Sequence, residues 1–203
     1  MFARLYPRIS QDAEGSGAAD HRRTLLAGLK GRVIEIGAGH GLNFSHYPPA
    51  VSQVVAVEPE PHLRGLAVKA AVGGSVPIEV RDGTAESLPA QDGEFDAAVV
   101  SLVLCSVSDQ QAALREIARA MRPDGELRFY EHVVSHRPRT ARIQRALDAT
   151  VYPFLAGGCH CARDTSAAIR EAGFQVQREE RFAFKGSRLA PAVAHILGTA
   201  RRP

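Results

Sequence analysis

The sequence predicts an α/β fold: a mainly parallel, seven-stranded sheet flanked by helices. Short apolar segments alternate with segments of helical periodicity, which is the pattern of βαβ units. The segment from Ala97 to Leu104 is almost continuously apolar, as expected for a central strand covered on both faces. A glycine-rich turn directly follows the first apolar segment. The predicted strands are Arg32–Gly37, Gln53–Glu58, Val76–Arg81, Phe95–Leu102, Glu126–Val133, Phe174–Phe184 and Ala194–Ala200.

The chain is expected to form one domain over residues 1–203, because 203 residues suit a single core. Residues 1–30 are predicted to be an N-terminal lid or helical segment, 31–184 the core and 185–203 a C-terminal segment. Within the first part, Asp12–Ala19 is rich in Gly, Ser and Ala and is predicted to be a mobile loop. A helix is expected near His21–Lys30. The side chains expected to close the lid are Phe2, Leu5 and Tyr6.

Two later helices carry capping signals. Asp109 is a plausible N-cap for a helix over Gln110–Met121, in which apolar residues recur at helical spacing. Pro123-Asp124-Gly125 is expected to end that helix and to turn the chain into the next strand. Asp164 or Thr165 can cap a second helix, which runs through Glu171 and closes at Gly173.

The composition narrows the classes of function. Lys and Arg exceed Asp and Glu by 25 to 22, and without interleaved aromatic residues this mild excess does not predict nucleic-acid binding. The arginine run over 137–145 is read as a solvated helix face. No stretch is long and apolar enough to predict a membrane span. Three cysteines, an odd count, favour a reducing compartment, and the chain is expected to be cytoplasmic.

The most specific motif is the glycine loop Gly37-Ala38-Gly39-His40-Gly41, which follows a strand. Its G-x-G-x-G spacing differs from the G-x-G-x-x-G of dinucleotide-binding turns. Glu35, two residues before the first glycine, would repel a pyrophosphate but suit the cationic amino-acid end of S-adenosyl-L-methionine (SAM). Glu58 ends the second strand, where a carboxylate can accept both ribose hydroxyls. Together these features favour SAM over a nicotinamide cofactor.

These residues resemble the class I SAM-dependent methyltransferases, particularly the ubiquinone and menaquinone C-methyltransferase branch. The stretches Gly83-Thr84-Ala85-Glu86-Ser87-Leu88-Pro89 and Gly93-Glu94-Phe95-Asp96 are similar to that branch's adenine-contact loop and fourth-strand entry. The resemblance implies that Thr84 and Ala85 contact the adenine edge. It also implies a Rossmann-like methyltransferase fold, with S-adenosyl-L-homocysteine (SAH) as the cofactor product.

A narrower resemblance points to the alkyl thiol methyltransferases of the methyltransferase-like seven group. It is carried by Leu102-Val103-Leu104-Cys105-Ser106-Val107, Glu131-His132-Val133, Gly158-Cys159-His160 and Ala194-His195-Ile196-Leu197-Gly198, and by Asn43-Phe44 with Tyr47-Pro48-Pro49. This likeness implies a small-molecule acceptor whose methylated atom is a thiol sulfur, in detoxification or natural-product tailoring. The alternatives left open are N-, O- or C-methylation of a small lipophilic metabolite, a nicotinamide-dependent oxidoreductase and a non-catalytic SAM-binding module.

Candidate catalytic residues follow from the same strand ends. His132 and Glu131 end the fifth strand, and because they are adjacent, their side chains are expected to point to opposite faces. Asp148, in the helix expected after that strand, is a further candidate. His195 is a candidate only because the resemblance to the alkyl thiol methyltransferases implies it. Cys159-His160-Cys161 could ligate zinc, but no second ligand pair is spaced for it, so no metal is predicted. The predicted cofactor-binding residues are Glu35, Gly37, Ala38, Gly39, Gly41, Asn43, Glu58, Pro59, Thr84, Ala85, Ser101 and Leu102.

Overall fold

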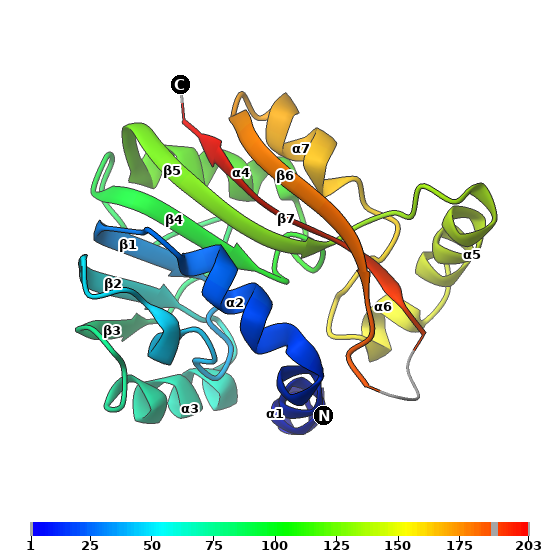
Figure 1. Ribbon diagram of the computed structural model, residues 1–203, viewed down its shortest axis with the longest axis horizontal. Coiled ribbons are helices and arrows are strands. Elements are labelled where there is room, and N and C mark those ends of the chain that lie inside the picture. Colours follow the sequence, from blue (N-terminus) through cyan, green and yellow to red (C-terminus); the bar gives the residue numbers. More distant parts are fainter. Residues whose placement is uncertain (1, 188–190, 203) are drawn as a thin grey trace.

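The computed structural model describes residues 2–187 and 191–202 and contains a seven-stranded sheet of order β3-β2-β1-β4-β5-β7-β6 (Figure 1). The five strands from β3 to β5 in this order are parallel, and β7 is antiparallel to both β5 and β6. The predicted mainly parallel α/β fold is therefore confirmed. The strands are β1 (Gly31–Ile36), β2 (Val51–Val57), β3 (Ile78–Arg81), β4 (Phe95–Ser101), β5 (Met121–His132), β6 (Gln175–Phe184) and β7 (Val193–Arg201).

Helices cover both faces of this sheet. Their bounds are α1 (Phe2–Ala13), α2 (Ala19–Leu26), α3 (Pro61–Ala71), α4 (Gln110–Ala120), α5 (Pro138–Asp148), α6 (Tyr152–Leu155) and α7 (Thr165–Glu171). Two core clusters result from the alternation of side chains along the strands. Ile34 and Val100 face the cluster that includes residues of α4 and α7, whereas Val33 and Val99 face the cluster that includes residues of α2 and α3. Central strands buried on both faces explain the unbroken apolar runs in the sequence.

The N-terminal segment differs from the prediction. Asp12–Ala19, predicted to be a mobile loop, is helical: α1 continues into a π-helical turn over Glu14–Ala18, and α2 follows at once. Gly17 has a φ of 114°, so the kink between the two helices lies at a residue that tolerates a left-handed backbone. The helix predicted near His21–Lys30 starts earlier and ends at Leu26.

Other boundaries are closer to the prediction. Asp109 caps α4 by accepting from the backbone N–H groups of Gln111 and Ala112, and Asp164 caps α7 through Ala167. The predicted turn at Pro123-Asp124-Gly125 lies inside β5, which already pairs with β4 from Met121 onward.

The segment after the glycine loop forms a 3-10 turn, Phe44–His46, and no α-helix. The chain reaches Pro48 and Pro49 directly after this turn, and proline cannot continue a helix.

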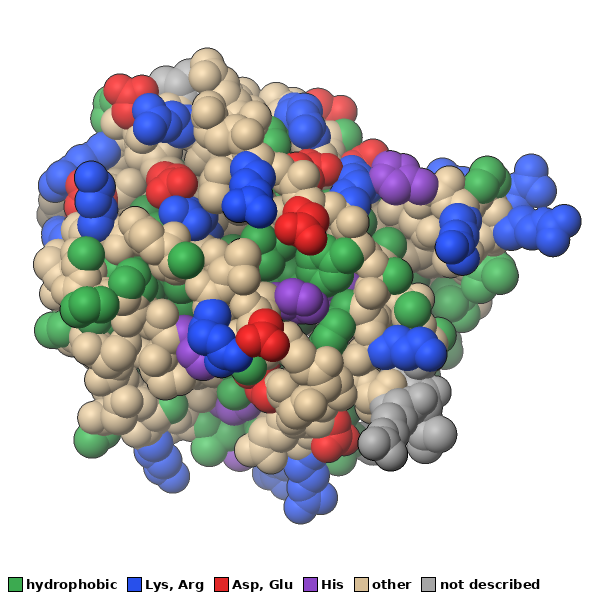
Figure 2. Space-filling view, in the orientation of Figure 1, with side chains coloured by type: hydrophobic (Ala, Val, Ile, Leu, Met, Phe, Trp, Pro, Cys, Tyr) green, Lys and Arg blue, Asp and Glu red, His purple; other side chains and the backbone are tan. Residues whose placement is uncertain are grey.

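The arginine run lies on α5, which projects from the body of the molecule together with α6 (Figure 1). Arg137, Arg139, Arg142 and Arg145 are all exposed, so the run is a solvated face as predicted. Lys and Arg side chains gather on this projection (Figure 2). Within the described residues, no helix has the length and apolar character needed to cross a membrane.

Because helices bury both faces of the sheet, truncation of a buried side chain should leave a cavity and lower the stability of the fold. Leu114 on α4 is fully buried, so Leu114→Ala should lower the free energy of unfolding by about 2–5 kcal/mol. Arg115→Ala on the exposed side of the same helix should change it by less than about 0.5 kcal/mol. Urea unfolding followed by circular dichroism measures both. Equal effects of the two substitutions would contradict the assigned orientation of α4.

Candidate functional site

The glycine loop connects β1 to the 3-10 turn at the carboxyl ends of the parallel strands. Gly37, Gly39 and Gly41 all have positive φ values, of 66°, 58° and 88°. A Cβ on Gly37 would lie 2.5 Å from a methyl carbon of Val103, and one on Gly41 would lie 2.7 Å from the ring of Phe44. Both positions therefore need glycine for backbone shape and for close packing. The packing also joins the loop to the segment that follows β4.

Glu58 follows β2 and faces this loop. One carboxylate oxygen accepts from the backbone N–H of Gly39 at 2.8 Å, and the other accepts from that of Glu60 at 2.9 Å. Burial raises the pKa of Glu58, and the two N–H bonds oppose that shift. Each oxygen keeps further acceptor capacity, so the carboxylate is held in place and can still bind a pair of hydroxyls.

Glu35 at the end of β1 is buried beneath the glycine loop. Its two oxygens accept from Asn43 Nδ2 at 2.9 Å and from Tyr47 Oη at 2.7 Å. Burial raises the pKa of Glu35 to about 7, although both hydrogen bonds favour the ionised form. A cationic ligand group near Glu35 would recover the free energy that burial costs the carboxylate.

A small cavity opens between this carboxyl and the N-terminal helices, and no motif in the sequence marks its most polar member. Arg22 on α2 is buried, and its Nη1 donates to Asn43 Oδ1 at 3.0 Å and to Ser101 Oγ at 3.2 Å. Its Nε pairs with Glu14 at 2.8 Å. The residues lining the cavity are Tyr6, Arg22, Glu35, Gly37, Ala38, His40, Leu42, Asn43 and Ser101.

The donor set of this cavity fits the amino-acid end of SAM. Arg22 presents a cation, Glu35 a carboxyl and Ser101 a hydroxyl, which match a ligand that carries both a carboxylate and an ammonium group. Nδ1 of His40, on the same lining, is buried without a hydrogen-bond partner among the described residues. A buried polar atom of this kind calls for a partner, and a bound ligand can supply one.

Helix α1 lies over the glycine loop. The ring of Tyr6 meets that of His40 edge-on at 5.7 Å, and Ser10 Oγ lies 3.4 Å from His40 Nε2. Burial raises the pKa of Tyr6, and the nearby Arg22 guanidinium opposes that shift. Leu5 is exposed, and the side chain of Phe2 lies outside the described part of the chain.

The remaining predicted cofactor residues lie at neighbouring strand ends. Pro59 follows Glu58, and Thr84 and Ala85 form a tight turn after β3 in which the N–H of Ser87 donates to the Thr84 carbonyl. Thr84 is exposed and Ala85 is buried. Leu102 has a φ of 60°, a backbone conformation that leucine rarely adopts and that is common near functional sites.

Glu131 on β5 holds the segment after β4. Its fully buried carboxyl accepts from the backbone N–H groups of Val103, Leu104 and Cys105 at 2.9, 3.0 and 3.2 Å. Burial raises its pKa to about 7, against the effect of these three bonds. Glu131 thus fixes the loop that packs on Gly37.

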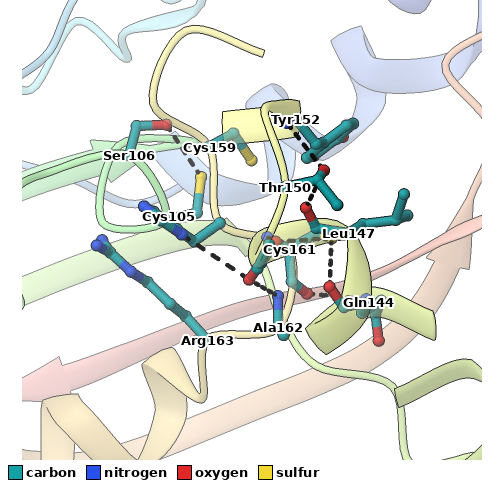
Figure 3. Close-up of polar contacts among 12 residues, drawn as sticks. Cys105, Ser106, Gln144, Leu147, Thr150, Tyr152, Cys159, Cys161, Ala162 and Arg163 are labelled. Carbon is teal, nitrogen blue, oxygen red and sulfur yellow. Dashed lines mark hydrogen bonds and ion pairs between the residues drawn. The ribbon is translucent and has the colours of Figure 1, made fainter. Parts of the chain in front are cut away.

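The side chain of His132 lies next to two cysteines, which belong to separate segments of the chain. Its Nδ1 lies 3.3 Å from Cys159 Sγ and 4.0 Å from Cys105 Sγ. Figure 3 shows the two cysteine side chains approaching one another from the loop after β4 and from the segment after α6. A hydrogen bond from Cys105 and the neighbouring His132 lower the pKa of Cys159 below that of an ordinary thiol, although burial opposes the shift.

The other two predicted catalytic residues have different surroundings. His195 pairs with His132 across β5 and β7, with the ring centroids 4.4 Å apart, and its ring also packs against Tyr130 and Phe182. Burial lowers its pKa to about 3, so its imidazole is neutral at physiological pH. Asp148 accepts from the backbone N–H groups of Cys161 and Ala162 and thereby holds the segment that carries Cys159.

Comparisons with known proteins identify the family of the chain. Residues 34–129 match the methyltransferase domain family. The human thiol S-methyltransferase TMT1B is 32% identical over 181 residues, which cover 86% of this chain and 73% of that protein. The chain belongs to the class I SAM-dependent methyltransferases.

Solved structures support the fold of this methyltransferase. A SAM-dependent methyltransferase from Thermotoga maritima superposes with a TM-score of 0.71 at 22% identity, covering 100% of this chain and 98% of that one. The [4+2]-cyclase SpnF gives a TM-score of 0.74 at 19% identity, covering 100% and 94%. Because a cyclase shares the fold, the fold alone does not fix the reaction. The sequence-based preference for SAM over a nicotinamide cofactor is confirmed by the family.

The buried Glu35 predicts a pH-dependent stability. The pKa of this carboxyl is about 7 in the folded protein and about 4.5 in the unfolded chain, so its contribution to stability falls as the pH rises between these values. Without SAM, Glu35→Gln should therefore gain stability relative to the wild type from pH 5 to pH 8, by an amount on the order of 3 kcal/mol. Urea unfolding at several pH values measures the difference. Parallel pH profiles for the two proteins would contradict the shifted pKa.

Proposed function

We propose that this methyltransferase transfers the methyl group of SAM to the sulfur of a small thiol. The proposal rests on the convergence of four side chains, those of Cys105, His132, Cys159 and His195. These four residues lie in the stretches that resemble the alkyl thiol methyltransferases, and they converge at the carboxyl end of the sheet. The 32% identity with a human thiol S-methyltransferase supports the same acceptor.

The cofactor is proposed to lie across the carboxyl ends of β1, β2 and β4. Glu58 would accept the ribose hydroxyls, because its oxygens face the glycine loop and are held by two backbone N–H groups. Arg22 would bind the carboxylate of the amino-acid end, with Glu35 near the ammonium group. Thr84 and Ala85 would border the adenine. Tyr6 and the rest of α1 would cover the cofactor and exclude water.

SAM supplies a methyl group on a sulfonium, which an acceptor sulfur attacks in line while the bonding electron pair stays with the SAH sulfur. The chain's own task is to align the acceptor and keep its sulfur desolvated. A thiol of ordinary pKa near 8.5 is partly ionised at neutral pH, so it needs little help from a base. The neutral His195 and its aromatic neighbours suit an apolar thiol better than a charged amine.

Cofactor binding tests the placement of Glu58 and Arg22. Glu58→Ala should weaken SAH binding about 100-fold, because hydrogen bonds to a charged group contribute about 1.5–3 kcal/mol each. Arg22→Ala should weaken it by at least tenfold. Glu79→Gln, which alters an exposed carboxylate on β3, is the matched control and should bind like the wild type. Isothermal calorimetry gives the affinities, with circular dichroism as a check on folding. An unchanged affinity in Glu58→Ala would mean that the cleft is misplaced.

The acceptor is tested by a methyl-transfer assay with mass spectrometry. The wild type should methylate alkyl and aryl thiols and leave the matched alcohols unmodified, since an alcohol lacks an accessible anion at neutral pH. Amines, phenols and carbon acids complete the panel. Methylation of one of those classes in preference to every thiol would overturn the thiol proposal while leaving the methyltransferase assignment intact.

A further inference from the structure

We propose that Cys105, His132 and Cys159 bind one Zn²⁺ ion and leave its fourth coordination position for the acceptor thiolate. The Sγ atoms of the two cysteines and a ring nitrogen of His132 all lie within 4.8 Å of one another. Two thiolates and an imidazole are ligands that zinc prefers. The role in thiol activation rests on the proposed function, whereas the metal site stands on the geometry of these three residues.

The distances fit a tetrahedral ion. With Zn–S near 2.3 Å and Zn–N near 2.0–2.1 Å, tetrahedral angles place a sulfur and a nitrogen ligand about 3.6 Å apart. The two separations from His132 Nδ1 are 3.3 Å to Cys159 Sγ and 4.0 Å to Cys105 Sγ, on either side of that value. The same nitrogen faces both sulfurs, so one ion can contact all three atoms after shifts of a few tenths of an ångström.

The backbone holds the two cysteine segments together. The N–H of His160 donates to the Cys105 carbonyl at 2.8 Å, and the Arg163 guanidinium donates to the carbonyls of Leu104 and Val107. A Cβ on Gly158 would lie 2.9 Å from the Ser106 carbonyl oxygen, so the segments are in direct contact there. Ligands fixed in this way need little ordering when a metal binds.

The proposed metal site also lies beside the glycine loop. Val103, two residues before Cys105, packs on Gly37 so closely that a Cβ there would be 2.5 Å away. Glu131 holds Val103, Leu104 and Cys105 through their backbone N–H groups. A group bound at the cysteines is therefore adjacent to the segment that shapes the cofactor cleft.

Three protein ligands define the chemistry. Zinc sites with four protein ligands are structural, whereas sites with three keep a position for substrate. On metal binding, Cys105 and Cys159 release their thiol protons to solvent, and the acceptor releases its proton when it takes the fourth position. The lone pair of the bound sulfur then forms the new C–S bond, and the pair from the breaking C–S bond stays on SAH. The neutral thioether is a weak ligand, so the product leaves.

Cobalt substitution tests the site without relying on activity. Co²⁺ added to the reduced wild-type protein should give sulfur-to-cobalt charge-transfer absorption and visible d–d bands of a tetrahedral site. One Zn²⁺ per chain should abolish both signals. Adding a small alkyl thiol should increase the charge-transfer absorption, because a further thiolate joins the ion.

Substitutions of the proposed ligands and of a nearby cysteine outside the cluster test which side chains bind the metal. Cys105→Ser/Cys159→Ser should weaken Zn²⁺ binding more than about 100-fold, since loss of even an outer-shell partner costs 10–100-fold. Cys161→Ser is the matched control, because Cys161 contacts Asp148 and lies outside the cluster. It should bind Zn²⁺ like the wild type. Chelator competition gives the affinities.

Two results would overturn the metal site. One is a wild-type cobalt spectrum no different from that of the double variant. The other is a Cys105–Cys159 disulfide that forms in the wild type in the presence of equimolar Zn²⁺, seen as a loss of two hydrogens by mass spectrometry. If Zn²⁺ binds but no thiol is methylated, the metal site stands and the proposed acceptor fails. If thiols are methylated at full rate after chelation, the acceptor stands and the metal role fails.

Discussion

The site depends on the hydrogen bonds between one buried carboxyl, that of Glu131, and the loop that follows β4. Glu131 accepts three consecutive backbone N–H groups after β4, in a fully buried position where unpaired donors would be costly. The loop that it fixes packs Val103 on Gly37 and places Cys105 beside His132. The cofactor side and the proposed acceptor side therefore share one short segment, and a shift in that segment would move both.

The second organising feature is the N-terminal helical pair. Arg22 joins Asn43 and Ser101 in one hydrogen-bonded group, next to the Glu35 carboxyl that Asn43 also contacts. Because α1 packs on the glycine loop through Tyr6, the same segment both supplies a cation and covers the cleft.

Local patterns in the sequence were enough to predict the sheet, the glycine loop and the position of Glu58, because each of these features depends on residues close together in the chain. The helical kink at Gly17 was missed, since glycine and serine normally favour loops, whereas this stretch continues the helices on either side of it. Nothing in the sequence distinguishes Arg22 from other arginines on helices, because its burial depends on tertiary contacts. Cys159 was considered with its neighbour Cys161, whereas the fold pairs it with Cys105 and His132.

A crystal structure of the protein with SAH and an alkyl thiol bound together tests this account most directly. The account predicts that the thiol sulfur lies at the Cys105–His132–Cys159 cluster and points along the line to the SAH sulfur, with Arg22 on the SAH carboxylate. A thiol bound on another surface, or SAH lying away from Glu58, would contradict it.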